Sequence, residues 1–209
     1  MLRRPIAAAL RVPHTKGPIA LDGELTEQDW RNAARSGPFG DASGSDARPF
    51  SEVRMLWDDS YLYLGLYAGD EDIRAAVCDH DGPVWTDDAF VMRFEAMDRP
   101  TFSYLIDVSA AGVVTDVRRD ATGRDDPSWD SGMELAVDRD GTLNDPTDWD
   151  EEWVIEARVP LRALAAQGVA GTSLLVQIHR CDTPRGGGAK RCASFGGPKD
   201  EPRAIELAP

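Results

Sequence analysis

Short runs in which apolar and polar side chains alternate dominate this sequence. In the run 61–67, Leu62, Leu64 and Leu66 fall on one side and tyrosines fall on the other. Successive side chains of a β-strand point to opposite faces, so a period of two predicts strands with one buried face. About eight such runs occur, at 52–58, 61–67, 89–95, 101–107, 112–118, 133–138, 152–159 and 173–180.

Helical signals are few beside these strands. Thr26 is placed to cap a short helix, with Asp29 three residues later. A second helix is expected from Pro160 to Gly168, because proline suits the first turn and glycine ends a helix. Many short strands with two short helices favour an all-β sandwich. Neither a linker nor an internal repeat is visible, which indicates one domain.

Charge and hydropathy limit the partners that the chain can take. The 209 residues carry a formal net charge of −14, which disfavours binding to nucleic acid and to anionic membranes. No apolar run approaches the ~20 residues of a membrane span. The start, at 1–14, has two arginines and an apolar stretch but no clear signal peptide. The default location is therefore cytoplasmic, and the compartment stays open.

Three cysteines are present. Cys181 and Cys192 flank a turn-rich segment and can face each other across a hairpin, where a disulfide and two reduced thiols are both natural. Cys78 is left without a partner, and an unpaired third cysteine slightly disfavours an oxidising compartment.

Five segments, in the right order, resemble the family 9 carbohydrate-binding modules. They are the opening "IALDGELTEQDW", the hairpin "VRMLWDDSYLYLGLYAGD", and the segments "WTDDAFVMRFE", "EEWVIEARVPLRAL" and "LLVQIHRCD". The resemblance implies an antiparallel jelly-roll-like β-sandwich over 17–209, related to DOMON-type cytochrome domains, with 1–16 as an N-terminal arm or first strand. It also implies that Trp30 is a core residue, and it makes a secreted or periplasmic location possible.

The sugar-binding members of that family clamp a terminal sugar between two tryptophans. The first of these corresponds to Trp85, in a loop before a strand, where the alternative is an indole folded onto the core. A family glutamate falls on Val91, which accepts no hydrogen bond from a hydroxyl. The C-terminal loop that should hold the second tryptophan has none, so Phe195 and Trp129 are the available substitutes.

Polar residues on the strands complete the expected ligand site. Arg93, Gln177 and His179 alternate with apolar side chains and either line a binding surface or form a solvated outer face. Trp57 and Trp153 are expected in the core by the same alternation. Trp149 is expected to lie in a loop against the sandwich.

Acidic turns raise the question of metals. Oxygen-rich turns suit calcium, which takes ~6–8 oxygen ligands, and family members often hold structural calcium. The candidates are Asp58, Asp59, Asp70 and Asp72. Haem, which the cytochrome relatives hold between a methionine and a histidine, is disfavoured because Met92 and His179 are expected on opposite faces.

Catalytic motifs are missing from the sequence. It contains no nucleophile elbow, phosphate-binding loop or His-Glu-x-x-His pattern. The leading hypothesis is therefore a non-catalytic module that recognises a glycan or another small ligand through an aromatic platform. The alternative is a structural or protein-interaction sandwich that has lost the sugar site, and the oligomeric state stays open.

Overall fold

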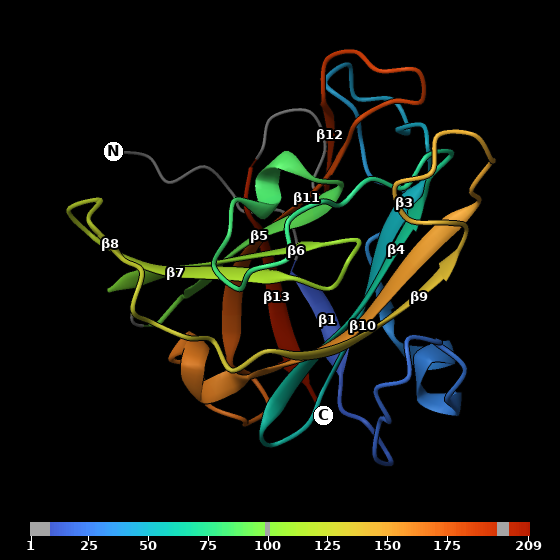
Figure 1. Ribbon diagram of the computed structural model, residues 1–209. Helices are drawn as coiled ribbons and strands as arrows, with labels where there is room; N and C mark the ends of the chain where they lie inside the picture. The colour runs from blue at the N-terminus through green and yellow to red at the C-terminus, as the bar shows by residue number, and fades with distance from the viewer. Residues whose placement is uncertain (1–8, 99–100, 196–200) are drawn as a thin grey trace.

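The computed structural model describes residues 9–98, 101–195 and 201–209, which form two β-sheets packed face to face (Figure 1). The larger sheet has the order β1 (Leu10–Pro13), β13 (Arg203–Ala208), β11 (Ser173–Asp182), β5 (Ala89–Ala96), β6 (Phe102–Ser109), β7 (Val114–Asp120) and β8 (Asp125–Asp126), and β12 (Arg191–Phe195) also pairs with β11. The smaller sheet has the order β2 (Ala34–Arg35), β3 (Ser51–Trp57), β4 (Tyr61–Gly69), β10 (Glu152–Pro160) and β9 (Glu134–Asp140).

Neighbouring strands are antiparallel, except that β1 runs parallel to β13. The antiparallel sandwich expected from the alternating pattern is therefore confirmed. The first eight residues, part of the expected N-terminal arm, lie outside the described residues, and positions 10–13 of that arm form β1.

The main core lies between the two sheets and contains the apolar side of the alternating runs. Trp57 and Trp153 are buried there, as expected. The Phe90 ring on β5 lies 5.1 Å from the Trp153 ring on β10, so aromatic side chains join the two sheets. The Trp57 indole donates a hydrogen bond to the carbonyl of Ala208 at 2.8 Å, which satisfies its polar atom inside the core.

A second, smaller apolar cluster lies on the other side of the small sheet. Trp30 is fully buried there with Ile19, Leu56 and Tyr63. The segment that precedes β2 therefore covers the outer side of this sheet. Trp30 is a core residue, as the resemblance implied, but its core is this separate cluster.

Glu156 on β10 fixes this covering segment. Its carboxylate accepts hydrogen bonds from the N–H groups of Asp22 (2.9 Å) and Gly23 (3.2 Å) and from the Trp30 indole (2.8 Å). Gly23 has a φ of +92°, and a Cβ at this position would lie 2.7 Å from the backbone nitrogen of Asp138. Glycine is therefore required at the Asp-Gly turn.

The helices are three short 3₁₀ segments: η1 (Gln28–Asn32), η2 (Val84–Thr86) and η3 (Leu161–Leu164). Thr26 does not cap the first, because Glu27 takes the N-cap position and makes no side-chain cap bond. The second expected helix is shorter than predicted and ends at Leu164, where Ala165 adopts a left-handed conformation. None of the helices in the described part is long and apolar enough to cross a membrane.

Cys181 and Cys192 form a disulfide between β11 and β12. Of the two alternatives at this hairpin, the structure therefore has the oxidised one. Cys78 is a free, exposed thiol.

Candidate functional site

The outer side of the large sheet brings three of the expected ligand residues together. Gln177 on β11 lies opposite Arg93 on β5, and His179 lies opposite Val91 in the next pair. Val91 in turn lies opposite Asp107 on β6. We call this surface the outer face; its residues are Val91, Arg93, Glu95, Ser103, Leu105, Asp107, Gln177 and His179.

Polar contacts order the outer face. The Arg93 guanidinium donates to Ser103 Oγ at 2.8 Å and also pairs with the Glu95 carboxylate, to which Ser103 donates at 2.8 Å. A pocket of about 280 Å³ opens beside them, lined in part by these three residues and Arg119. His179 Nδ1 lies 2.9 Å from Ser194 Oγ. Arg93 is thus held in place while it still borders an open pocket.

Asp107 was not among the residues expected from the sequence. Its carboxyl lies in the row that contains His179 and Val91, and burial raises its pKa to about 6. Its position is a matter of strand register between β5 and β6, which an alternating pattern on one strand does not reveal.

Trp85 lies in a loop that packs on the outer side of the large sheet. It belongs to η2 and is 54% exposed, so the indole is not folded onto the core. The same loop lies over the sheet, because the Thr115 hydroxyl donates to the carbonyl of Gly82. Lys190 donates from Nζ to the carbonyl of Trp85 at 2.7 Å, which fixes the backbone that carries the ring.

The two expected aromatic substitutes do not join Trp85. Phe195 pairs with Ile178 of β11, is 5% exposed and stacks on Phe39 in the main core. Trp129 packs against Tyr104, with ring centroids 5.2 Å apart, on the core side of β6. Neither ring lies on the outer face: alternation along β12 turns Phe195 into the core, and Trp129, in the loop after β8, packs on the core side of Tyr104. Residues 196–200 of the C-terminal loop lie outside the described residues.

The four aspartates expected to hold calcium lie at opposite ends of β4. Asp58 accepts hydrogen bonds from two backbone N–H groups of its own turn and from the Tyr63 hydroxyl. Asp59 lies 3.3 Å from His14. At the other end, Asp72 pairs with Arg74. Because the length of β4 separates the two pairs, the four residues do not converge on a common cation site.

Asp70 belongs to a buried cluster of charged side chains. Its carboxylate lies 2.6 Å from the Arg180 guanidinium and also accepts a bond from the Trp153 indole at 3.0 Å. Arg180 also pairs with Asp182 at 3.0 Å. Asp70, Asp182 and Asp88 are close enough to share a metal ion. The Arg180 cation is already paired with two of these carboxylates, so the donor set does not fit calcium as it stands.

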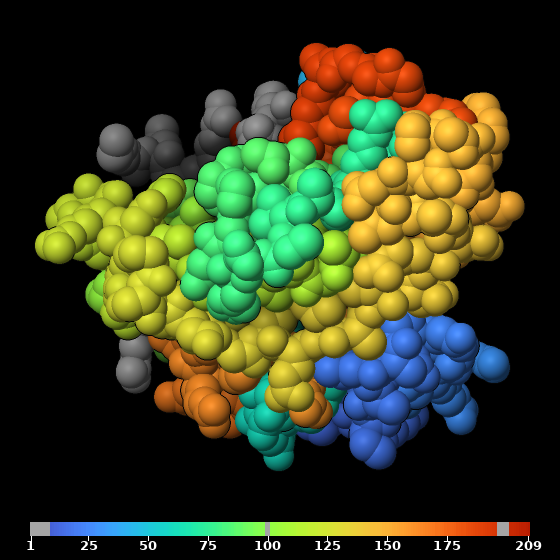
Figure 2. Space-filling view, in the orientation of Figure 1, coloured from blue at the N-terminus to red at the C-terminus, as the bar shows by residue number. Residues whose placement is uncertain are grey.

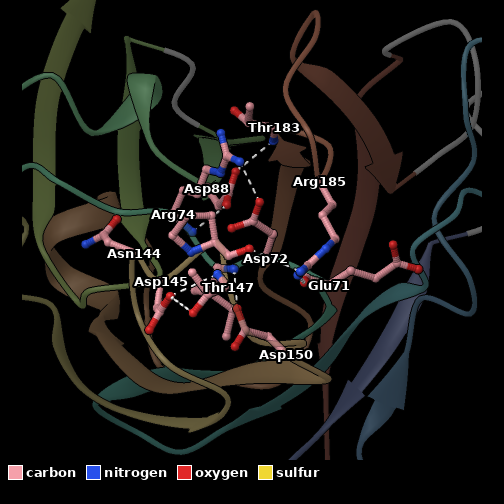
Figure 3. A network of polar contacts seen from close by, with 12 residues as sticks. Glu71, Asp72, Arg74, Asp88, Asn144, Asp145, Thr147, Asp150, Thr183 and Arg185 are labelled. Atoms are coloured by element: carbon pink, nitrogen blue, oxygen red, sulfur yellow. Dashed lines mark hydrogen bonds and ion pairs between the residues drawn. The ribbon is translucent and has the colours of Figure 1, made fainter.

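Asp88 is the least compensated carboxylate of that cluster. It accepts the backbone N–H groups of Arg74 and Thr183, each at 2.8 Å (Figure 3). Burial, with the nearby charge of Asp70, raises its pKa to about 7. These bonds tie the segment that follows β4 to the residue that follows β11, so Asp88 joins the two loops to which they belong.

The loops around this cluster, at 70–88, 141–150 and 182–191, are called the loop end. Figure 2 shows segments 79–88 and 141–150 on the same face of the molecule. A cleft of about 490 Å³, called the loop cleft, lies between the loops. Its lining includes Asp72, Arg74, Thr86, Asp87, Asn144 and Pro146.

Trp149 differs from its expected position. It is 69% exposed and does not lie against the sandwich. The Arg185 guanidinium lies 4.1 Å from the centre of its ring, so the side chain rests on an arginine of another loop. No sequence pattern predicts this contact, since the two residues are on different loops and neither is part of an alternating run.

Comparison with known proteins adds structural relatives. No family model and no curated protein matches the sequence. A candidate carbohydrate-binding protein from Bacteroides uniformis has a similar structure, with a TM-score of 0.73 and 12% identity over 95% of this chain and 98% of that one.

Two further similar structures are of a family 9 carbohydrate-binding module from Caldicellulosiruptor kristjanssonii. The complex with cellotriose has a TM-score of 0.64 and 16% identity over 95% of this chain and 93% of that one. The complex with glucose has a TM-score of 0.63 and 16% identity over 94% of this chain and 95% of that one. The fold is therefore that of the family 9 carbohydrate-binding modules.

Proposed function

We propose that this chain is a non-catalytic carbohydrate-binding module whose ligand packs on Trp85 and extends over the outer face. The observation that carries the proposal is the exposure of Trp85 in a loop that packs on a polar surface of this fold. An exposed indole offers an apolar platform to the C–H face of a pyranose. A tryptophan buried in the core would have favoured the structural alternative instead.

The polar residues of the outer face suit sugar hydroxyls, which both donate and accept hydrogen bonds. Arg93 supplies donors beside its pocket, and Asp107 supplies acceptors. Gln177 and His179 lie on the neighbouring strand and add a mixed set of donors and acceptors. Val91 separates His179 from Asp107, so a ligand that crosses this row contacts an apolar side chain between two polar ones.

The experiment is isothermal titration of the protein with glucose, cellotriose and a wider panel of mono- and oligosaccharides. Trp85→Ala is expected to abolish saturable binding because it removes the platform. Arg93→Ala is expected to weaken binding at least fivefold, since hydrogen bonds to charged groups contribute about 1.5–3 kcal/mol. Val169→Ala is the control, because this residue is also exposed, at 52%, but lies in the turn before β11.

Each titration, together with a measurement of the melting temperature, is repeated with calcium and with a chelator, because the sequence leads us to expect structural calcium although the four candidate aspartates do not converge on one site. A higher melting temperature in calcium would support this expectation. Saturable binding that survives Trp85→Ala would remove the platform from the proposal. The absence of binding to every saccharide would favour the alternative, a structural or protein-interaction sandwich.

A further inference from the structure

Trp149 is the most exposed large apolar side chain in the described part of the chain. Burying an apolar side chain of this size contributes about 1.5–3 kcal/mol of favourable free energy. Because most of the Trp149 ring is exposed, most of this free energy is still available to a ligand that covers it. Single exposed apolar residues are common on protein surfaces. Trp149 differs from these because its surroundings hold it in place.

Arg185 holds the indole from one side. Its guanidinium lies over the ring at 4.1 Å and donates to the carbonyls of Glu71 at 2.9 Å and Pro146 at 3.1 Å, and to that of Asp148. Three carbonyls on two loops therefore fix the arginine, and the arginine fixes the ring. One face of the indole is covered by the cation, and the exposed area belongs to the opposite face and the edge.

The loop that carries Trp149 is itself fixed to its neighbours. Asn144 forms two hydrogen bonds with the backbone of Ala75, at 2.9 and 2.8 Å, and Asp150 accepts the N–H of Ile73 at 2.6 Å. Within the loop, Asp145 accepts hydrogen bonds from the N–H and hydroxyl of Thr147 (Figure 3). A ring held in advance loses little conformational freedom when a ligand packs on it, which favours affinity.

The loop that carries Trp149 borders the loop cleft. Asn144 and Pro146, from the loop of Trp149, line one part of it, and Thr86 and Asp87, the residues that follow Trp85, line another. Among its charged residues, Arg74 is paired with Asp72, and the carboxylate of Asp87 accepts the N–H of Val77 at 3.0 Å. The lining as a whole combines carboxylate, hydroxyl, amide and apolar groups, which disfavours an anion and suits a neutral, hydroxyl-rich ligand whose hydroxyls donate to the carboxylates.

We propose that Trp149, braced by Arg185, is a second carbohydrate platform, and that a neutral oligosaccharide crosses the loop cleft between the Trp149 loop and the Trp85 loop. This inference rests on the proposed function and extends it from one sugar unit to several. A monosaccharide covers one ring only, whereas a longer chain contacts both. Trp149 therefore contributes to the affinity for long saccharides and leaves the affinity for glucose unchanged.

The test compares the wild-type protein, Trp149→Ala and Trp85→Ala in titrations with glucose, cellotriose and cellohexaose. Trp149→Ala is expected to weaken cellohexaose binding about tenfold and to leave glucose binding within twofold, since a tryptophan at the centre of an interface typically contributes more than 1 kcal/mol. Arg185→Met, which keeps a long side chain but loses the guanidinium, is expected to weaken cellohexaose binding by a smaller factor.

A second readout locates the ligand directly. N-bromosuccinimide oxidises exposed indoles, and peptide mass spectrometry identifies which ones react. Cellohexaose is expected to protect both Trp149 and Trp85, and glucose to protect Trp85 alone. Unchanged melting temperature would show that Trp149→Ala is folded, as its exposure predicts.

The outcomes separate the two proposals. One result would overturn the second platform and leave the proposed function standing. In it, Trp85→Ala loses binding, Trp149→Ala keeps the wild-type affinity for cellohexaose, and cellohexaose does not protect Trp149 from oxidation. Failure of every saccharide to bind the wild-type protein would overturn both. A weaker affinity of Trp149→Ala for all saccharides alike would also overturn the length-dependent role of this residue.

Discussion

The buried carboxyl of Glu156 makes the stability of the fold depend on pH in a direction that its surroundings determine. Burial is the largest effect and raises its pKa from 4.5 to about 7. The hydrogen bonds from Asp22, Gly23 and the Trp30 indole stabilise the carboxylate and oppose this rise. The folded protein therefore binds this proton more tightly than the unfolded chain does.

The sign and size of the effect follow from linkage. The stability that protonated Glu156 contributes is fully present below pH 4.5 and is lost as the pH rises through about 7. At 1.36 kcal/mol per pKa unit, the loss between pH 5 and pH 8 is about 2 to 3 kcal/mol. This is a sizeable part of a total stability of about 5–15 kcal/mol.

The perturbation that isolates this effect is Glu156→Gln, which removes the titration. The amide turns an N–H towards one of the donors, and that costs about 1–3 kcal/mol at every pH. The free energy of unfolding of the variant, minus that of the wild type, is therefore expected to rise by about 2 to 3 kcal/mol from pH 5 to pH 8. Urea denaturation, followed by circular dichroism at each pH, measures this difference.

Glu24→Gln is the matched control, because Glu24 is an exposed residue of the same segment. Its difference from the wild type should not change with pH. A constant difference for Glu156→Gln would refute the reasoning. A difference for Glu156→Gln that falls with rising pH would show that the three hydrogen bonds outweigh the burial of the charge.

The remaining predictions concern the loop end. Replacing both Cys181 and Cys192 by serine should lower the free energy of unfolding by about 2 to 3 kcal/mol, seen as a lower urea midpoint, because the short loop is no longer closed in the unfolded chain. Asp70→Asn should destabilise the protein by about 3–5 kcal/mol by the same assay, since Arg180 then keeps a buried charge without its nearest partner. The carboxyl of Asp88 should titrate near pH 7 in a carbon-detected NMR experiment, and a midpoint near 4 would contradict the effect of burial.

The sequence predicted the features that depend on one strand alone, namely where each strand lies and which of its side chains are buried. The runs 61–67 and 152–159 predicted both the strands and the buried positions of Leu64 and Trp153, because alternation reports which side of a strand is covered. The same reasoning placed Arg93 and Gln177 outward. It did not show that they are opposite each other, which depends on the pairing of β5 with β11.

Loop positions were harder to predict because distant contacts determine them. Trp149 was expected against the sandwich. Instead its exposed ring lies against the guanidinium of Arg185, which is 36 positions later in the chain. Phe195 was a reasonable substitute for a missing tryptophan until its pairing with Ile178 turned it into the core. Glu156 was part of the quoted resemblance, yet its contact with Trp30 joins residues 126 positions apart.

The hairpin between Cys181 and Cys192 has a consequence for both exposed indoles. It carries Arg185, on which Trp149 rests, and Lys190, which holds the backbone of Trp85. The positions of both rings thus depend on one short hairpin, which the disulfide closes at its base. A reducing agent that breaks this disulfide is therefore expected to make the hairpin more mobile while the two sheets stay folded. Both indoles would then lose part of the support that keeps them in position.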